Sequence, residues 1–243
     1  MFAYDSELLA LVQTAPQSVD DVVHTLEAIE STCADGDGLK WFNWLYLQVT
    51  LAIQQRVNAN GFTNSAWVAD LDYRFAGFYF DAVRTALSGL SDEATPGCWQ
   101  AMFDVRNQTR LGRIQFAMAG INAHINHDLA LAVIATCQAT DVAPQHGTPQ
   151  YNDYTAVNAT LNGLIDLAKQ TLHLRLLGDD LPAVSHIDDT IAAWSMADAR
   201  ETAWNNAELL WQLANAPLLK ASFLDGLDGL TAVASKTLLV AAR

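Results

Sequence analysis

Apolar residues recur along this chain every three or four positions, the pattern of helices that bury one face. The first clear example follows Ser18, with Asp21 three residues later, as expected where a capped helix begins. Its apolar face consists of Val19, Val22, Val23, Leu26 and Ile29. No stretch alternates apolar and polar residues as a half-buried strand does. The pattern predicts an all-α bundle of about seven to nine helices, folded as a single domain over residues 1–243.

Two segments in the first half of the chain predict the centre of this bundle. The segment Lys40–Asn58 is apolar almost all round, as is typical of a helix enclosed by others. A second helix is expected from Ser65, with an inward aromatic stripe. A long helical stretch then runs from Cys98 to about Thr140, with an interruption expected near Gly112 or Gly120.

The second half of the chain predicts further helices. They are expected over Tyr151–Leu176, Ser185–Ala193 and Ser195–Ala214, where Ser195 and Asp198 resemble a second capped start. Pro217 should open a short helix, and Gly226 and Gly229 should flank a turn into a last helix that ends near Arg243.

Composition and charge narrow the class of protein. The chain has 243 residues, of which 51% are apolar, so it can bury a large core. Its 13 basic and 27 acidic residues give a net charge of −14, which argues against binding to nucleic acids or to anionic membranes. No stretch reaches the roughly 18 apolar residues of a membrane span. The three widely spaced cysteines fit reduced thiols, so we expect a cytoplasmic protein.

The most distinctive polar segment is Gly120–Leu129, which contains His124 and Asp128. These two residues are four positions apart and therefore share one face of a helix. A carboxylate in this position orients an imidazole for proton transfer, or the pair holds a divalent metal ion from one helix. A purely structural pair, in which each residue satisfies the other, stays open as an alternative.

Two other segments carry polar groups among apolar residues. Asp70, Asp72 and Asp81 lie on the aromatic helix after Ser65 and are candidates for a second carboxylate opposite His124. Asp70 can also pair with Arg74 four residues later. Near the end of the chain, Arg200 shares a helical face with Trp204. A buried arginine needs a carboxylate or an anionic ligand, and we expect an internal ion pair there.

These same segments resemble an uncharacterised family, domain-of-unknown-function family 5995. The resemblance covers about Lys40–Leu210, and its most specific part is Asn122-Ala123-His124-Ile125 with Asp128-Leu129. The matching stretches are Lys40–Tyr46 with Val49-Thr50, Asp70–Asp81, Gly120–Leu131 and Arg200–Ala207. The resemblance implies a mainly helical single domain and supplies no activity.

Taken together, the residues favour an enzyme that acts on an apolar small molecule, lipid-, polyketide- or terpenoid-like, in a dry aromatic pocket. The candidate catalytic residues are His124, Asp128, Asp70 and Asp81. Residues expected to line the ligand site are Asn122, Tyr46, Trp44, Asp72, Tyr79, Arg200 and Trp204. A metal on His124 and Asp128 would favour hydrolysis, and a metal-free site would favour cyclisation or isomerisation.

Two non-catalytic hypotheses compete with this one. In the first, the same pocket carries a hydrophobic ligand without changing it. In the second, the chain is a helical interaction module whose Trp-rich segment Lys40–Asn58 is covered by a partner or by a second copy in a homodimer.

Overall fold

The computed structural model describes residues 2–89, 94–161 and 195–241. Throughout this part of the chain the regular structure is helical, which confirms the predicted all-α bundle. The predicted helix Ser185–Ala193 lies outside the described residues, as does the end of the predicted helix Tyr151–Leu176, whose beginning falls in a helix over residues 149–161. None of the described helices is long and apolar enough to cross a bilayer.

The first half of the chain forms α1 (Asp5–Leu11), α2 (Val19–Thr32), α3 (Gly38–Asn58) and α4 (Ser65–Ser88). The middle forms α5 (Gly97–Phe103), α6 (Arg113–Ala123), the π-helical turn η1 (His124–Asp128) and α7 (Leu129–Ala139). The last part forms α10 (Met196–Gln212), the short 3₁₀ turn η2 (Leu213–Asn215) and α11 (Pro217–Leu238).

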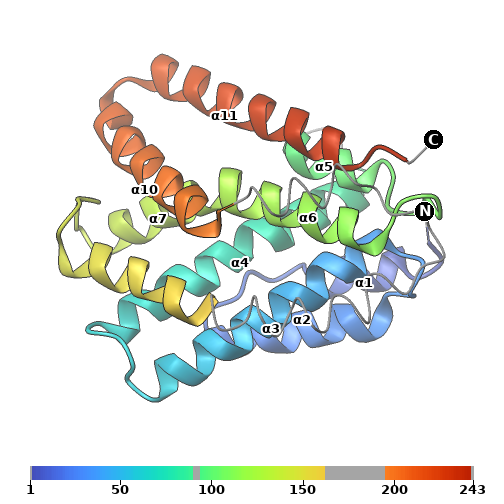
Figure 1. Ribbon diagram of the computed structural model, residues 1–243, viewed down its shortest axis with the longest axis horizontal. Coiled ribbons are helices and arrows are strands. Elements are labelled where there is room, and N and C mark those ends of the chain that lie inside the picture. The colour runs from blue at the N-terminus through green and yellow to red at the C-terminus, as the bar shows by residue number, and fades with distance from the viewer. Residues whose placement is uncertain (1, 90–93, 162–194, 242–243) are drawn as a thin grey trace.

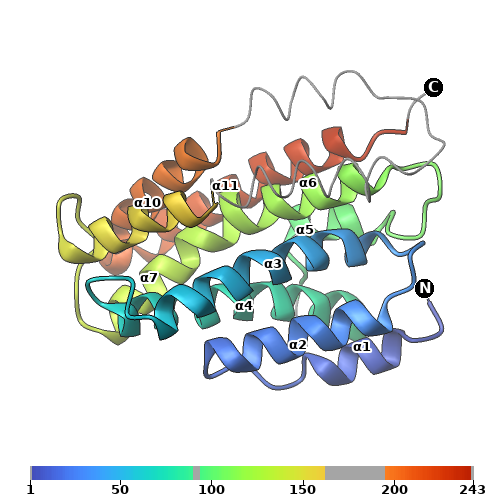
Figure 2. The same cartoon turned by 60° about the horizontal axis from the view of Figure 1, so that its bottom comes forward.

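The helices lie in layers along the long axis of the molecule (Figures 1 and 2). On one side α1 and α2 pack beside α3 and α4, and on the other side α10 and α11 cover α7, α6 and α5. The continuous rod made by α6, η1 and α7 lies between these two groups. Its central turn, η1, contacts α4, α10 and α11.

Polar side chains fix where several helices begin. The hydroxyl groups of Ser18 and Ser195 accept hydrogen bonds from the backbone N–H groups of Asp21 and Asp198, at 3.1 and 3.2 Å. Both predicted capped starts are therefore present. These bonds satisfy N–H groups that have no partner within the first turn of a helix.

The predicted interruption near Gly112 is confirmed, whereas the predicted turn at Gly226 and Gly229 is wrong. The interruption in the segment after Cys98 covers residues 104–112 and ends at Gly112, whereas Gly120 lies inside unbroken helix. Gly226 and Gly229 likewise lie within α11, which is one continuous helix from Pro217 to Leu238. A glycine in open space costs a helix only about 1 kcal/mol, which the packing of α11 on α5 and α6 outweighs.

Gly120 has a packing role instead. A Cβ atom at this position would lie 2.3 Å from the ring of Phe42 on α3. Carbon atoms cannot approach this closely, so any residue other than glycine would displace Phe42. The reverse contact occurs one turn along the same two helices, where a Cβ atom on Gly38 of α3 would lie 2.3 Å from the ring of Phe116 on α6. On each helix a glycine thus leaves room for a phenylalanine ring of the other helix. The absence of two side chains allows α3 and α6 to pack closely.

The buried apolar residues form two clusters that meet at η1. The first cluster joins α1, α2, α5 and α6 to parts of α3 and α4. The second joins α7, α10 and the helix over residues 149–161 to the other ends of α3 and α4. Ile121, just before η1, packs against both. The polar residues of η1 therefore lie at the boundary between two apolar cores.

The close approach of α3 and α6 predicts a clear difference between two glycine substitutions. Gly120→Ala should lower the free energy of unfolding by about 1–3 kcal/mol, because the added methyl group displaces Phe42. Gly77→Ala, in open space on α4, should raise it by roughly 0.5–1 kcal/mol. Urea unfolding of both variants tests this, and equal effects of the two substitutions would contradict the packing described here.

Candidate active site

The centre of the candidate site is the π-helical turn η1, which carries His124, His127 and Asp128. The three residues are only 3%, 7% and 1% exposed, so a cluster of three titratable groups is held away from water. Wider turns of this kind within an α-helix occur frequently at functional sites. The chain passes from α6 through η1 into α7 without a break.

Asp128 accepts three hydrogen bonds from nitrogen atoms. Its Oδ2 atom lies 3.1 Å from His124 Nδ1 and 2.9 Å from Trp99 Nε1, and its Oδ1 atom lies 2.7 Å from His127 Nδ1. Burial by itself raises the pKa of Asp128, but the hydrogen bonds from both histidines outweigh it and hold the pKa below its usual value. The carboxylate is therefore ionised, and each histidine carries its proton on Nδ1.

His124 lies in a shell of aromatic rings. The ring of Phe75 stacks on the imidazole with centroids 3.5 Å apart, and the rings of Tyr46 and Phe42 meet it edge-on at 4.5 and 5.6 Å. Burial lowers the pKa of His124 more than Asp128 raises it, so the ring is neutral at pH 7. Its Nε2 atom is buried and has no hydrogen-bond partner within the described part of the chain.

Several other buried polar atoms have no hydrogen-bond partner among the described residues, and one of them is Asp72 Oδ2 on α4. Tyr46 Oη and Thr50 Oγ1 on α3 are also buried, and they lie close enough to interact with each other. Burial raises the pKa of Asp72 to about 7. Burial, and then the charge of Asp72, raises the pKa of Tyr46 well above its usual value. Sequence reasoning named Tyr46 and Asp72 but missed Thr50, which follows Tyr46 by one helical turn.

The other two candidate carboxylates lie elsewhere on α4. Asp70 pairs with Arg74 at 3.1 Å and also accepts a hydrogen bond from Tyr73. Asp81 is exposed and pairs with Arg84 at 3.2 Å, because position 81 falls on the outer face of the helix rather than among the aromatic rings. Of the three carboxylates, Asp72 is the one with a buried oxygen that lacks a partner among the described residues, and its charge acts on Tyr46, which packs against His124.

Three further predicted ligand-site residues have packing roles. The amide of Asn122 donates at 2.9 Å to Thr231 O and to Ser235 Oγ, which ties α6 to α11. Tyr79 packs its ring against Phe42 and donates to Asn43 at 3.4 Å. Trp44 is buried on α3.

Arg200 and Trp204 form a separate network on α10. The guanidinium of Arg200 donates to Asn158 Oδ1 at 2.7 Å and to the Tyr154 carbonyl at 2.8 Å. The predicted ion pair of Arg200 is therefore wrong among the described residues, because its hydrogen-bond acceptors are neutral groups. Burial lowers the pKa of Arg200. Trp204 donates to Glu208 at 3.1 Å, and Trp194, which precedes this helix, lies outside the described residues.

The comparison with known families agrees with the resemblance seen in the sequence. A model of a family of unknown function (DUF5995) matches residues 19–241, which is most of the chain. The chain belongs to the DUF5995 family. No curated protein and no solved structure matches it significantly. For this DUF5995 member, an activity must therefore be argued from the geometry of its side chains.

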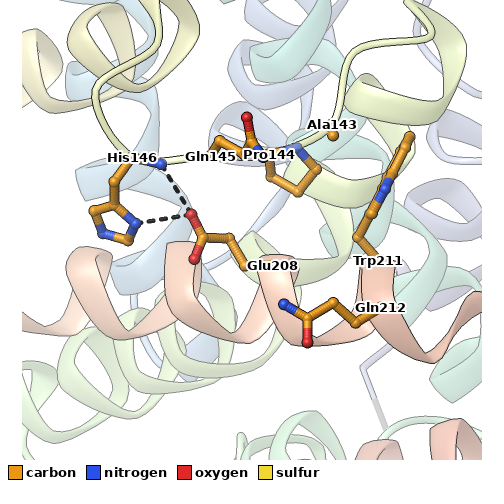
Figure 3. Close-up of a pocket in the computed structure, with 7 residues that line it drawn as sticks. All are labelled: Ala143, Pro144, Gln145, His146, Glu208, Trp211 and Gln212. Atoms are coloured by element: carbon orange, nitrogen blue, oxygen red, sulfur yellow. Dashed lines mark hydrogen bonds and ion pairs between the residues drawn. The ribbon is translucent and has the colours of Figure 1, made fainter.

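A surface hollow of about 470 Å³ in this DUF5995 member lies where the 143–146 loop meets α10 (Figure 3). Its main polar feature is His146, whose Nδ1 and Nε2 atoms lie 2.7 Å from Glu208 Oε1 and from Glu201 Oε1. The hydrogen bond with Glu201, and then that with Glu208, raises the pKa of His146. This charged contact fastens the loop to α10 and lies outside the buried cluster around His124.

The network around Asp128 predicts a large effect of one isosteric substitution. Asp128→Asn replaces one carboxylate oxygen by an NH₂ group, so a buried N–H donor of His124, His127 or Trp99 loses its acceptor. We expect the free energy of unfolding to fall by about 2–4 kcal/mol. Asp225→Asn, at an exposed position on α11, should change it by less than about 0.5 kcal/mol. Urea unfolding compares the two, and similar small effects would refute the proposed importance of the network.

The contact between His146 and the two glutamates predicts a pH-dependent contribution to stability. Because the folded chain raises the pKa of His146, the stabilisation is present below the unfolded pKa of about 6.5 and is lost as the pH rises through the folded value. His146→Gln should therefore lower the melting temperature more near pH 6 than near pH 9, and less in high salt. His24→Gln, at an exposed site on α2, is the control. A difference that grows with pH would show that the assignment is wrong.

Proposed function

We propose that this DUF5995 member is an enzyme that transfers protons on an apolar small molecule, with His124 as its general base and acid. The observation that carries the proposal is the state of the His124 ring. One nitrogen is held by a buried carboxylate, and the other is buried without a partner among the described residues. A purely structural histidine would be expected to use both nitrogen atoms.

Asp128 suits the role of the group that orients the base. Its bond to Nδ1 fixes the tautomer, so the lone pair of the neutral ring lies on Nε2, the atom without a partner among the described residues. When Nε2 takes a proton, the ionised carboxylate stabilises the resulting imidazolium. Because Asp128 already accepts three N–H groups, this role fits the pair better than joint coordination of a metal ion.

A second group of suitable acidity lies on the facing helix. Burial raises the pKa of Asp72 to about 7, so a large share of its carboxyl groups carry a proton at neutral pH. His124 has a lowered pKa and is the base. Pairs of titratable groups held in opposite protonation states are typical of acid–base sites. Tyr46 packs against His124 and its pKa responds to the charge of Asp72, which supports a role for its hydroxyl group in positioning a substrate.

The aromatic rings around His124 support an apolar substrate. Phe42, Tyr46 and Phe75 surround the imidazole, and such walls favour a lipid-, polyketide- or terpenoid-like molecule. Phe75 is only partly buried and stacks directly on the ring, so it must move aside for a substrate to reach Nε2. Proton transfer in this setting fits an isomerisation or a cyclisation.

Incubation with an apolar metabolite extract, followed by mass spectrometry, tests the proposal. We expect loss of one compound with matched gain of an isomer. His124→Gln and Asp72→Asn should each slow this conversion by about 10²–10⁴-fold, the usual contribution of a positioned acid or base. His24→Gln, far from the site on α2, should leave the rate unchanged. A compound that binds the wild-type protein without any product would instead identify a carrier, and unchanged turnover in His124→Gln would exclude the proposed base.

A further inference from the structure

A second cluster of reactive side chains lies on the other side of Asp128. It consists of Cys98 on α5, His127 on η1 and Asp228 on α11, whose possible metal-binding atoms all lie within 4.8 Å of one another. Cys98 and His127 are buried, and Asp228 is half-buried. A thiolate, an imidazole and a carboxylate are the three kinds of side chain that bind Zn²⁺ in proteins.

His127 is already oriented as a metal ligand would be. Its Nδ1 atom is held at 2.7 Å by Asp128 Oδ1, which leaves Nε2 as the nitrogen available to an ion. Metal-binding histidines usually donate their other ring N–H to a carboxylate in this way, which fixes the ring and makes it a better ligand. Asp128 is itself fixed by Trp99 at 2.9 Å, and Trp99 is the residue next to Cys98.

Asp228 is also fixed in place. Its two carboxylate oxygens accept hydrogen bonds from the backbone N–H groups of Gly97 and Cys98, at 2.8 and 2.9 Å. Each oxygen of an ionised carboxylate has a second acceptor position, so these bonds leave room for an ion. They also hold the start of α5 against α11, and so bring the sulfur of Cys98 toward the carboxylate.

We propose that Cys98, His127 and Asp228 bind a single divalent zinc ion. The donor set supports this identity, because sulfur and imidazole ligands select zinc over Mg²⁺ and Ca²⁺, which prefer oxygen. Three protein ligands leave the fourth position of a tetrahedral ion for water or for a substrate, as in catalytic zinc sites. This inference is independent of the acid–base role proposed for His124.

Binding requires two small changes in the protein. Ligand atoms around tetrahedral zinc lie about 3.5 Å apart, given metal–ligand distances of about 2.0–2.3 Å, so the three side chains must draw in by roughly 1 Å. Burial also raises the pKa of the Cys98 thiol well above its usual range. Burial by itself lowers the pKa of His127, but the hydrogen bond and charge of Asp128 raise it overall, so the ion must displace protons from both residues as it binds.

Metal titration of the 243-residue chain tests the site. The purified protein is first examined for bound metal by elemental mass spectrometry, then stripped with a chelator and titrated with Zn²⁺ or with Co²⁺ as a spectroscopic substitute. We expect one equivalent to bind and a sulfur-to-cobalt charge-transfer band to appear. Cys98→Ser should abolish that band, and His127→Gln should weaken binding at least about 100-fold.

The control variants separate loss of a ligand from loss of the fold. Cys137→Ser removes another buried free thiol, on α7, and should retain the full band and affinity. Asp128→Asn, which changes the residue behind His127 but no ligand, should weaken binding about 10–100-fold. Asp228→Asn also alters a helix cap, so Cys98→Ser, checked by circular dichroism, is the decisive variant.

Three results would overturn the proposal. They are binding of less than one equivalent by the wild-type chain, the absence of a sulfur-to-cobalt band, and a band that survives in a folded Cys98→Ser protein. Each outcome leaves the test of His124 untouched, since that test measures turnover in His124→Gln rather than metal.

Discussion

The arrangement at the centre of this bundle depends on a charge that has been removed from water. An ionised carboxylate in an apolar interior is stable only where several donors compensate for its lost hydration. Asp128 obtains that compensation from His124, His127 and Trp99, which lie on η1 and α5. The hydrogen bonds to this one carboxylate therefore help to fix the position of α5 and the orientation of both imidazole rings.

The two histidines face different surroundings although they share this carboxylate. His124 lies among aromatic rings, where burial keeps it neutral. His127 lies toward Cys98 and Asp228, and although burial by itself lowers its pKa, the hydrogen bond and charge of Asp128, aided by Asp228, raise it overall. A single buried anion thus holds two histidines whose pKa values are shifted in opposite directions. The proposed acid–base site draws on the aromatic surroundings of His124, and the proposed zinc site draws on the polar surroundings of His127.

Local sequence spacing predicted the parts of this site that depend on one helix. The contact between His124 and Asp128 follows from their four-residue spacing, and the starts at Ser18 and Ser195 follow from short capping patterns. Contacts between segments far apart in the chain could not be predicted from spacing. Asp228 lies 130 residues from Cys98 along the chain, and nothing in either segment indicates that they meet.

The remaining differences have physical causes that a helical pattern does not encode. Asp81 belongs to an aromatic segment, but its side chain is exposed on the outer face of the helix. The residues next to it in sequence therefore did not indicate its surroundings. Arg200 is satisfied by an amide and a carbonyl group, which the expectation of an ion pair had not considered. From the sequence alone, Gly120 was expected to interrupt the helix. In the structure it lies within the helix, and its missing side chain leaves room for the ring of Phe42.

The π-helical turn also constrains how this protein can change in evolution. Such a turn acts as one extra residue in an α-helix, and each added residue rotates the rest of the helix by about 100°. The register of α7 relative to α6 is set by that rotation, which lets one rod face two different apolar clusters. Insertion or deletion of a single residue between Gly120 and Leu129 would turn α7 away from its partners. Related chains that keep this architecture should therefore preserve the length of this segment.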